Sequence, residues 1–232
     1  MMADDASPIA DPRLELEALL APIYRQQGDF DLDRLAAFAA GLDSANYVTS
    51  HMAGARRCKS KRALFTEAAT RATLPGLVLE FGVFSGRSIN RLAELFPGPV
   101  YGFDSFEGLP EKWGRFRKGH FATSLPAVAE NVSLVVGWFN ETLPGFLREH
   151  PGDIRLLHVD CDLYSSTKTI FTECRDRIRV GTVIVFDEYF NYAGWRDHEF
   201  KAFQEFIGET GRKYEYFGLT TQGQQVGAVI TG

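Results

Sequence analysis

The sequence predicts a doubly wound α/β domain whose mostly parallel sheet ends in an antiparallel hairpin and is preceded by a helical cap. Short apolar runs alternate with helical segments from residue 77 to residue 186. The runs are continuously apolar, which indicates strands buried on both faces of a sheet. The intervening helices supply the right-handed crossovers that parallel strands require. The five runs are Leu77–Phe81, Val100–Phe103, Leu134–Val136, Ile154–Val159 and Val183–Phe186.

The start of the chain is predicted to be helical after a frayed end. Residues 1–12 combine small, acidic and proline residues without periodicity, so we expect no fixed structure there. From Leu14 to about Ala72, apolar residues recur at helical spacing. We therefore expect an N-terminal extension and helical cap in residues 1–72 and an α/β domain in residues 73–232.

The end of the chain predicts one more helix and then the hairpin. A helix is expected from about Gly194, with four large apolar side chains at helical spacing that face the core. The segments Lys213–Leu219 and Gln224–Thr231 flank a turn-like TTQG and predict two paired strands. A hairpin in this place is unlike most dinucleotide dehydrogenases. The four side chains are Phe200, Phe203, Phe206 and Ile207.

Charge and composition exclude several classes of protein. The net charge of −5 and the isoelectric point near 5.6 argue against a nucleic-acid partner. The short basic run at residues 56–62 is expected to be a solvated face or loop, with contact to an anionic ligand as the alternative. No run approaches the roughly 18 apolar residues of a membrane span, and the N-terminus is acidic, so a cytoplasmic protein without a membrane partner is expected. The three cysteines lack zinc-site spacing and are expected to be packing residues.

A glycine-containing turn follows the first predicted strand. Its pattern, acid-x-Gly-x-x-x-Gly, allows a tight turn and lets a ligand lie against bare backbone at the start of the next helix. The pattern G-x-G-x-x-G, which brings a pyrophosphate to a helix N-terminus, is absent. Because Glu80 can pair with an ammonium group, the turn predicts a cofactor with an amino-acid part and no phosphate. The predicted contacts are Glu80, Phe81, Gly82, Val83, Ser85, Gly86 and Ser88.

A second set of candidate cofactor contacts follows the second and third strands. Asp104 stands about 20 residues after the glycine turn, where a carboxylate can accept hydrogen bonds from both hydroxyls of a ribose. A cap or turn role is the alternative for Asp104. Ser105 lies beside it, and Gly137 and Trp138 follow the third strand. We expect Trp138 either beside an adenine ring or packed in the core.

Four acidic residues follow the fourth and fifth strands. If these strands are neighbours, about 4.8 Å separates them, so Asp160, Asp187 and Glu188 can meet at one cation. Oxygen ligands of this kind suit Mg²⁺ or a similar ion. The alternative is that one or two of the acids only cap the following helices. None of the five histidines has ligand spacing, so we expect no histidine ligand.

Four segments of the chain resemble the macrocin O-methyltransferase family, a branch of the class I S-adenosylmethionine-dependent methyltransferases that modifies sugars and other hydroxylated parts of natural products. The segments are LEFGVFSGRS, GFDSFEGLPE, HVDCDLYSST and VFDEYFNYAGW. The resemblance covers roughly residues 75–230. It implies a Rossmann-like sheet of seven strands with a reversed last strand.

The resemblance also implies roles for single residues. The cofactor acids of the family fall on Glu80 and Asp104. Asp162 matches the general base of some members, and Asp160 lies beside the cofactor and the reacting groups. Other members use a histidine near the same loop, but no histidine follows Asp162 here. The implied metal ligands are Asp160, Asp187 and Glu188.

The expected function is S-adenosylmethionine-dependent O-methylation, assisted by Mg²⁺ or a similar ion, of a hydroxyl on a sugar or another small natural product. The alternatives are N-methylation of an amino sugar or similar metabolite, a non-catalytic cofactor-binding protein and, more distantly, a nicotinamide oxidoreductase. A homodimer is expected. We expect acceptor selectivity to reside in residues 14–72, Glu111–Ser124 and Asn191–His198, because loops and caps vary more than the sheet.

Overall fold

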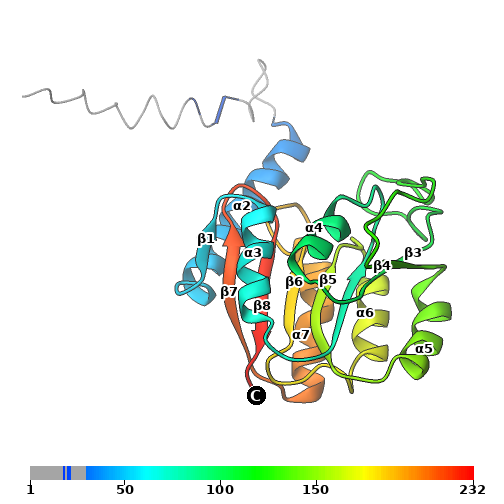
Figure 1. The fold of residues 1–232 in the computed structure, drawn as a ribbon. Coiled ribbons are helices and arrows are strands. Elements are labelled where there is room, and N and C mark those ends of the chain that lie inside the picture. The colour runs from blue at the N-terminus through cyan, green and yellow to red at the C-terminus, as the bar shows by residue number, and fades with distance from the viewer. Residues whose placement is uncertain (1–17, 19, 22–29) are drawn as a thin grey trace, which may run out of the picture.

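The computed structural model describes residues 30–232 together with residues 18, 20 and 21. The predictions for residues 1–12 and for much of the first helical stretch lie outside the described residues. Within the described part, a single sheet is covered on both faces by helices (Figure 1).

The sheet has eight strands, of which only the last is reversed. The strands are β1 (Arg56–Cys58), β2 (Leu77–Phe81), β3 (Val100–Asp104), β4 (Val132–Val136), β5 (Ile154–Val159), β6 (Val183–Phe186), β7 (Tyr214–Thr220) and β8 (Val226–Ile230). Their order is β1-β7-β8-β6-β5-β2-β3-β4. β8 runs antiparallel to β6 and β7, and the other neighbours are parallel. The predicted fold class and C-terminal hairpin are confirmed.

β1 adds an edge strand to the seven that the sequence implies. It runs parallel to β7, with Arg56 opposite Gly218 and Cys58 opposite Thr220. Two of its three residues are exposed arginines, so no apolar pattern predicts it. The basic run expected to be a solvated face or loop is therefore an edge strand that leads into helix α3 (Lys61–Arg71).

Helices cover the two faces of the sheet and form two apolar cores. The remaining helices are α2 (Leu32–His51), α4 (Arg87–Leu95), α5 (Phe139–Glu149), α6 (Tyr164–Glu173), α7 (Glu199–Thr210) and the short 3-10 helix η1 (Trp195–Asp197). α3 and α4 pack on one face, and α2, α5, α6 and α7 on the other. Phe203 and Phe206 of α7 are buried, and Phe200 and Ile207 pack against the same core, as predicted.

Other sequence expectations concern burial and domain boundaries. All three cysteines are buried and unpaired, as expected of packing residues. In the described ranges, no helix combines the length and the apolar character needed to cross a bilayer. The boundary between residues 72 and 73 stays a prediction.

The carboxyl ends of β2, β3, β5 and β6 meet along one edge of the sheet. The register places Phe81 opposite both Phe103 and Val159. It also places Val159 opposite Phe186. The residues that follow these positions are neighbours for this reason, and this is where open α/β sheets bind ligands.

Candidate active site

A cavity of about 990 Å³ opens at this edge of the sheet. Most of the site residues predicted from the sequence line it. Five of them do not: Glu80, Phe81, Gly86, Gly137 and Asp187. The predicted residues in the wall include Gly82, Val83, Ser85, Ser88, Asp104, Ser105, Trp138, Asp160, Asp162 and Glu188.

Gly82 lets the turn after β2 cross close to the turn after β5. Its φ is +92°, and a Cβ atom here would lie 1.7 Å from the carbonyl oxygen of Asp160. Gly86 has a φ of +77° and directly precedes α4. A side chain at Gly82 would therefore force apart the two turns that carry the candidate cofactor and acidic residues.

Asp104 fastens the glycine turn to the end of β3. Its Oδ2 accepts hydrogen bonds from the backbone N–H groups of Val83 and Phe84, at 2.8 and 2.9 Å. Its Oδ1 accepts one from the N–H of Phe106 at 2.8 Å. A carboxylate has about four acceptor positions, so ribose hydroxyls can share these oxygens with the backbone.

Glu80 does not line the cavity and forms a fully buried pair with His158. The Ser88 hydroxyl donates to its Oε1 at 3.0 Å, and its Oε2 is 2.9 Å from Nδ1 of His158. Burial raises the pKa of Glu80 well above its ordinary value and lowers the pKa of His158 well below its own. The site therefore favours a neutral imidazole.

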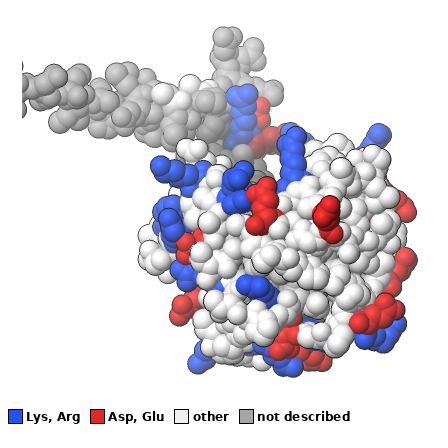
Figure 2. Space-filling view, viewed as in Figure 1, with Lys and Arg blue, Asp and Glu red and all other residues white. Residues whose placement is uncertain are grey.

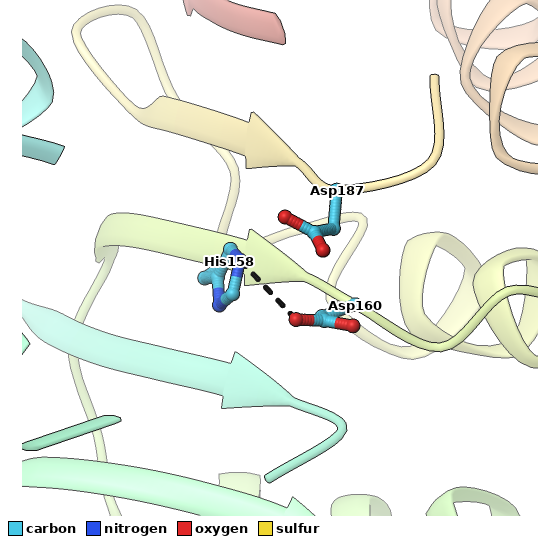
Figure 3. A group of neighbouring side chains, drawn as sticks. All are labelled: His158, Asp160 and Asp187. Carbon is cyan, nitrogen blue, oxygen red and sulfur yellow. Dashed lines mark ion pairs between the residues drawn. The ribbon is translucent and has the colours of Figure 1, made fainter. Parts of the chain in front are cut away.

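Asp160 and Asp187 meet at the ends of β5 and β6, with His158 beside them (Figure 3). One ligand atom from each of the three lies within 4.8 Å of the others. His158 Nε2, 3.9 Å from Asp160 Oδ2, is buried without a hydrogen-bond partner. The sequence analysis expected no histidine ligand and so did not include His158 in this group. The signal that could have found it is its spacing of two residues from Asp160, because residues two apart on a strand share a face.

Lys61 is the basic neighbour of this group, and the sequence did not single it out. Its Nζ lies 2.8 Å from Asp160 Oδ2 and 2.7 Å from Asp187 Oδ1. It belongs to the basic run, and only the packing of α3 against the sheet brings it to the two aspartates. Figure 2 shows that lysines and arginines are otherwise scattered over the visible face among acidic residues.

Two further acids complete the surroundings. Glu188 lies outside the group of three, and its Oε2 is buried without a hydrogen-bond partner. Glu199 is fully buried and accepts hydrogen bonds from the N–H groups of Cys161 at 3.4 Å and Glu188 at 3.2 Å. Burial, and then the nearby aspartates, raise the pKa of both glutamates well above its ordinary value. Glu199, which sequence reasoning missed, links the turns after β5 and β6.

Asp162 faces the cavity from a strained backbone position. Its φ is +64°, in the left-handed region that few side chains adopt. Burial, followed by the charges of Asp160 and Asp187, raises the pKa of Asp162 to about 7. A carboxyl group with such a pKa can both accept and release a proton near neutral pH.

The segment between β3 and β4 supplies an aromatic wall. Trp113, Phe116 and Phe121 line the cavity, and the rings of Trp113 and Phe116 stack with centroids 5.5 Å apart. These residues fall within the predicted selectivity segment Glu111–Ser124. The cap contributes Lys61, Arg62 and Phe65, all from α3.

Comparison with known proteins shows which families and structures the chain is similar to. Residues 79–189 match a family model described as a methyltransferase domain. The matched segment is therefore similar to a methyltransferase domain. The chain is 29% identical over 144 residues to demethyldecarbamoylnovobiocin O-methyltransferase of Streptomyces niveus, covering 50% of this chain and 53% of that protein. It is 27% identical over 152 residues to mycinamicin III 3''-O-methyltransferase of Micromonospora griseorubida, covering 53% and 59%.

The chain therefore spans little more than half the length of these curated relatives. Among solved structures, it is similar to the calicheamicin methyltransferase CalS11, with a TM-score of 0.59 and 23% identity over 98% of this chain and 88% of that one. It is also similar to the O-methyltransferase NovP, with a TM-score of 0.59 and 20% identity over 74% and 80%. These two likenesses establish the fold.

Proposed function

We propose that the protein is an S-adenosylmethionine-dependent O-methyltransferase that acts on a hydroxyl of a sugar or another small natural product. The observation that carries this proposal is the position of Asp162, a candidate base, in the same cavity as the glycine turn and Asp104. The curated relatives named above are both O-methyltransferases, which supports the oxygen atom as the acceptor.

Binding of the cofactor falls to the turns after β2, β3 and β4. S-adenosylmethionine, when bound, supplies an electrophilic methyl group. Asp104 would accept hydrogen bonds from the ribose hydroxyls, and Trp138 would hold the adenine. Ser88 and the backbone of the glycine turn would hold the amino-acid part. Glu80, which does not line the cavity, acts on that part by orienting Ser88.

Asp162 accepts the proton of the acceptor hydroxyl as the methyl group is transferred. Its fixed backbone and its pKa near 7 suit this role, because a base must be ionised at working pH and still able to take up a proton. The cavity walls would hold the acceptor beside the cofactor, and such positioning lowers the barrier to transfer further.

A divalent cation fits the acidic end of the cavity. Asp160 and Asp187 offer carboxylate oxygens, and two buried atoms without partners, His158 Nε2 and Glu188 Oε2, are available beside them. We assign Asp160 and Asp187 as ligands, completed by Glu188 as the sequence predicts or by His158. A bound Mg²⁺ or similar ion would make a coordinated hydroxyl more acidic.

The test is methyl transfer to hydroxylated sugar acceptors, followed by mass spectrometry and NMR of the product. A methyl ether is expected, and activity should fall in EDTA and return with Mg²⁺. A methylated amine would support the alternative of N-methylation. Absence of transfer to any oxygen or nitrogen acceptor, with the cofactor bound, would favour a non-catalytic protein. The cytoplasmic location and the homodimer stay predictions from the sequence.

A further inference from the structure

The basic run in residues 56–62 does not act as one surface. Arg56 pairs with Glu67 at 2.7 Å, and Arg62 lies 3.8 Å from Glu94, so both contact acids outside the acidic group. Lys61 instead reaches into that group at the ends of β5 and β6. Among the residues that the structure describes, no other lysine or arginine forms an ion pair with Asp160 or Asp187.

The position of Lys61 is unfavourable for the helix that carries it. Lys61 is the first residue of α3, after the N-cap Ser60, and the first turn contains no acidic residue. A cation at a helix N-terminus is repelled by the helix dipole. The contacts with Asp160 and Asp187 offset this repulsion, so interaction with the acidic pair explains the lysine better than helix stability does.

The ammonium group occupies the space that a metal ion would need. Nζ lies within hydrogen-bonding distance of one oxygen of each aspartate, and the face of Phe65 is nearby, with the ring centroid at 5.7 Å. A divalent cation bound to the same two oxygens requires metal–oxygen distances of about 2.0–2.6 Å. Nζ and the ion cannot be there together.

We propose that Lys61 is an internal competitor for the divalent cation: its ammonium group holds Asp160 and Asp187 together when no metal is bound and has to leave before a metal can enter. The inference rests on the proposed function in taking these aspartates as metal ligands. Metal loading then requires the movement of one side chain, and in the metal-free protein the ammonium group offsets part of the negative charge of the two aspartates. The apparent metal affinity equals the intrinsic affinity multiplied by the fraction of molecules in which Lys61 has moved away.

The test is direct titration with Mn²⁺, followed by electron paramagnetic resonance of the free ion, on the full chain without substrate. Lys61→Met is expected to bind Mn²⁺ about tenfold more tightly than the wild type or better, because the closed population is removed. Arg62→Met removes a neighbouring charge, and Lys168→Met removes a lysine of equal exposure that pairs with Glu205 and Glu209 elsewhere. Neither control should gain affinity.

Equal affinities of Lys61→Met and wild type, or an equal gain in Arg62→Met, would overturn the role of Lys61 and leave the metal site intact. No Mn²⁺ binding by any variant would overturn the metal assignment as well, while methyl transfer would still test the proposed activity.

If Lys61→Met does not fold, a labelling experiment on the wild-type protein tests whether the metal displaces Lys61. Acylation of Lys61 by acetic anhydride, measured by mass spectrometry, should increase when Mg²⁺ is added, whereas acylation of Lys168 should not. Unchanged Lys61 labelling at saturating Mg²⁺ would refute the displacement.

Discussion

Burial and neighbouring charge give the acids at the cavity different affinities for protons. The pKa of Asp160 is raised to about 6 and that of Asp162 to about 7, with burial as the first cause in both. Lys61 opposes these shifts. Asp162 is the acid of this pair without an ion pair to Lys61, which leaves its oxygens available to a substrate proton.

For Asp162, the prediction concerns turnover and its pH dependence. Because only the ionised carboxylate accepts a proton, kcat/KM should rise as pH increases through the pKa of Asp162 and be lost below it. That pKa is about 7 without a bound cation and lower with one. Asp162→Asn should lower kcat by roughly 10²–10⁴ and remove this dependence, because the amide cannot accept the proton. Steady-state rates between pH 5.5 and about 9 measure both effects. Unchanged cofactor affinity in calorimetry is the control, and a variant that keeps the same pH profile would exclude Asp162 as the base.

For Asp104, the prediction concerns cofactor affinity. Asp104→Ala removes the acceptor for the ribose hydroxyls and also frees the backbone N–H groups of the glycine turn. The affinity for S-adenosylmethionine should fall at least about tenfold, since hydrogen bonds to charged groups contribute roughly 1.5–3 kcal/mol. Isothermal titration calorimetry measures the loss, and circular dichroism checks that the fold persists. Wild-type affinity in a folded variant would contradict the assignment.

At the scale of elements, the site depends on how closely the turns that follow the strands approach one another. The turn after β2 touches the turn after β5 at Gly82, and the turns after β5 and β6 are joined by Glu199. The acidic group and its surroundings therefore belong to several elements rather than to a single motif.

Gly82→Ala should separate the cost of a close approach from the cost of backbone strain. At Gly82 both apply, whereas Gly194 has a φ of +84° and open space, with no atom within 4 Å of where a Cβ would lie. Gly194→Ala should lose about 1 kcal/mol of unfolding free energy, and Gly82→Ala about 3 kcal/mol or more. Urea denaturation measures both values. Equal losses would show that the turns can move apart freely.

Glu199 provides a second test at this scale. Its raised pKa favours the neutral acid, which glutamine imitates in shape. Glutamine keeps one oxygen acceptor, but its NH2 group cannot accept from the second backbone N–H, so Glu199→Gln should lose only roughly 1–2 kcal/mol. Glu199→Ala leaves two buried N–H groups without acceptors and should lose roughly 2–4 kcal/mol, measured by urea denaturation. Equal stability of the two variants would remove the linking role.

For the whole molecule, ligand binding to the native state should raise the melting temperature. S-adenosylmethionine at about 100 times its Kd should add about 2.7 kcal/mol of stability, and NAD should add none. Thermal unfolding with each compound measures the difference, with adenosine as a control for adenine binding alone. Stabilisation by NAD but not by S-adenosylmethionine would favour the oxidoreductase alternative over the methyltransferase.

The fold class, the hairpin and most of the predicted residues that line the cavity follow from the amino-acid sequence alone. Continuous apolar runs report burial on both faces, and residues that follow parallel strands collect at one edge of the sheet. The side chains that complete the acidic group become apparent only from the three-dimensional packing. Lys61 and Glu199 belong to helices, and nothing in their spacing along the chain from the strands predicts their contacts with the acidic group. His158 has the sequence pattern of an ordinary buried strand residue. Their roles follow from packing, because a polar or charged group is stable in the low-dielectric interior only where a partner lies within a few ångströms.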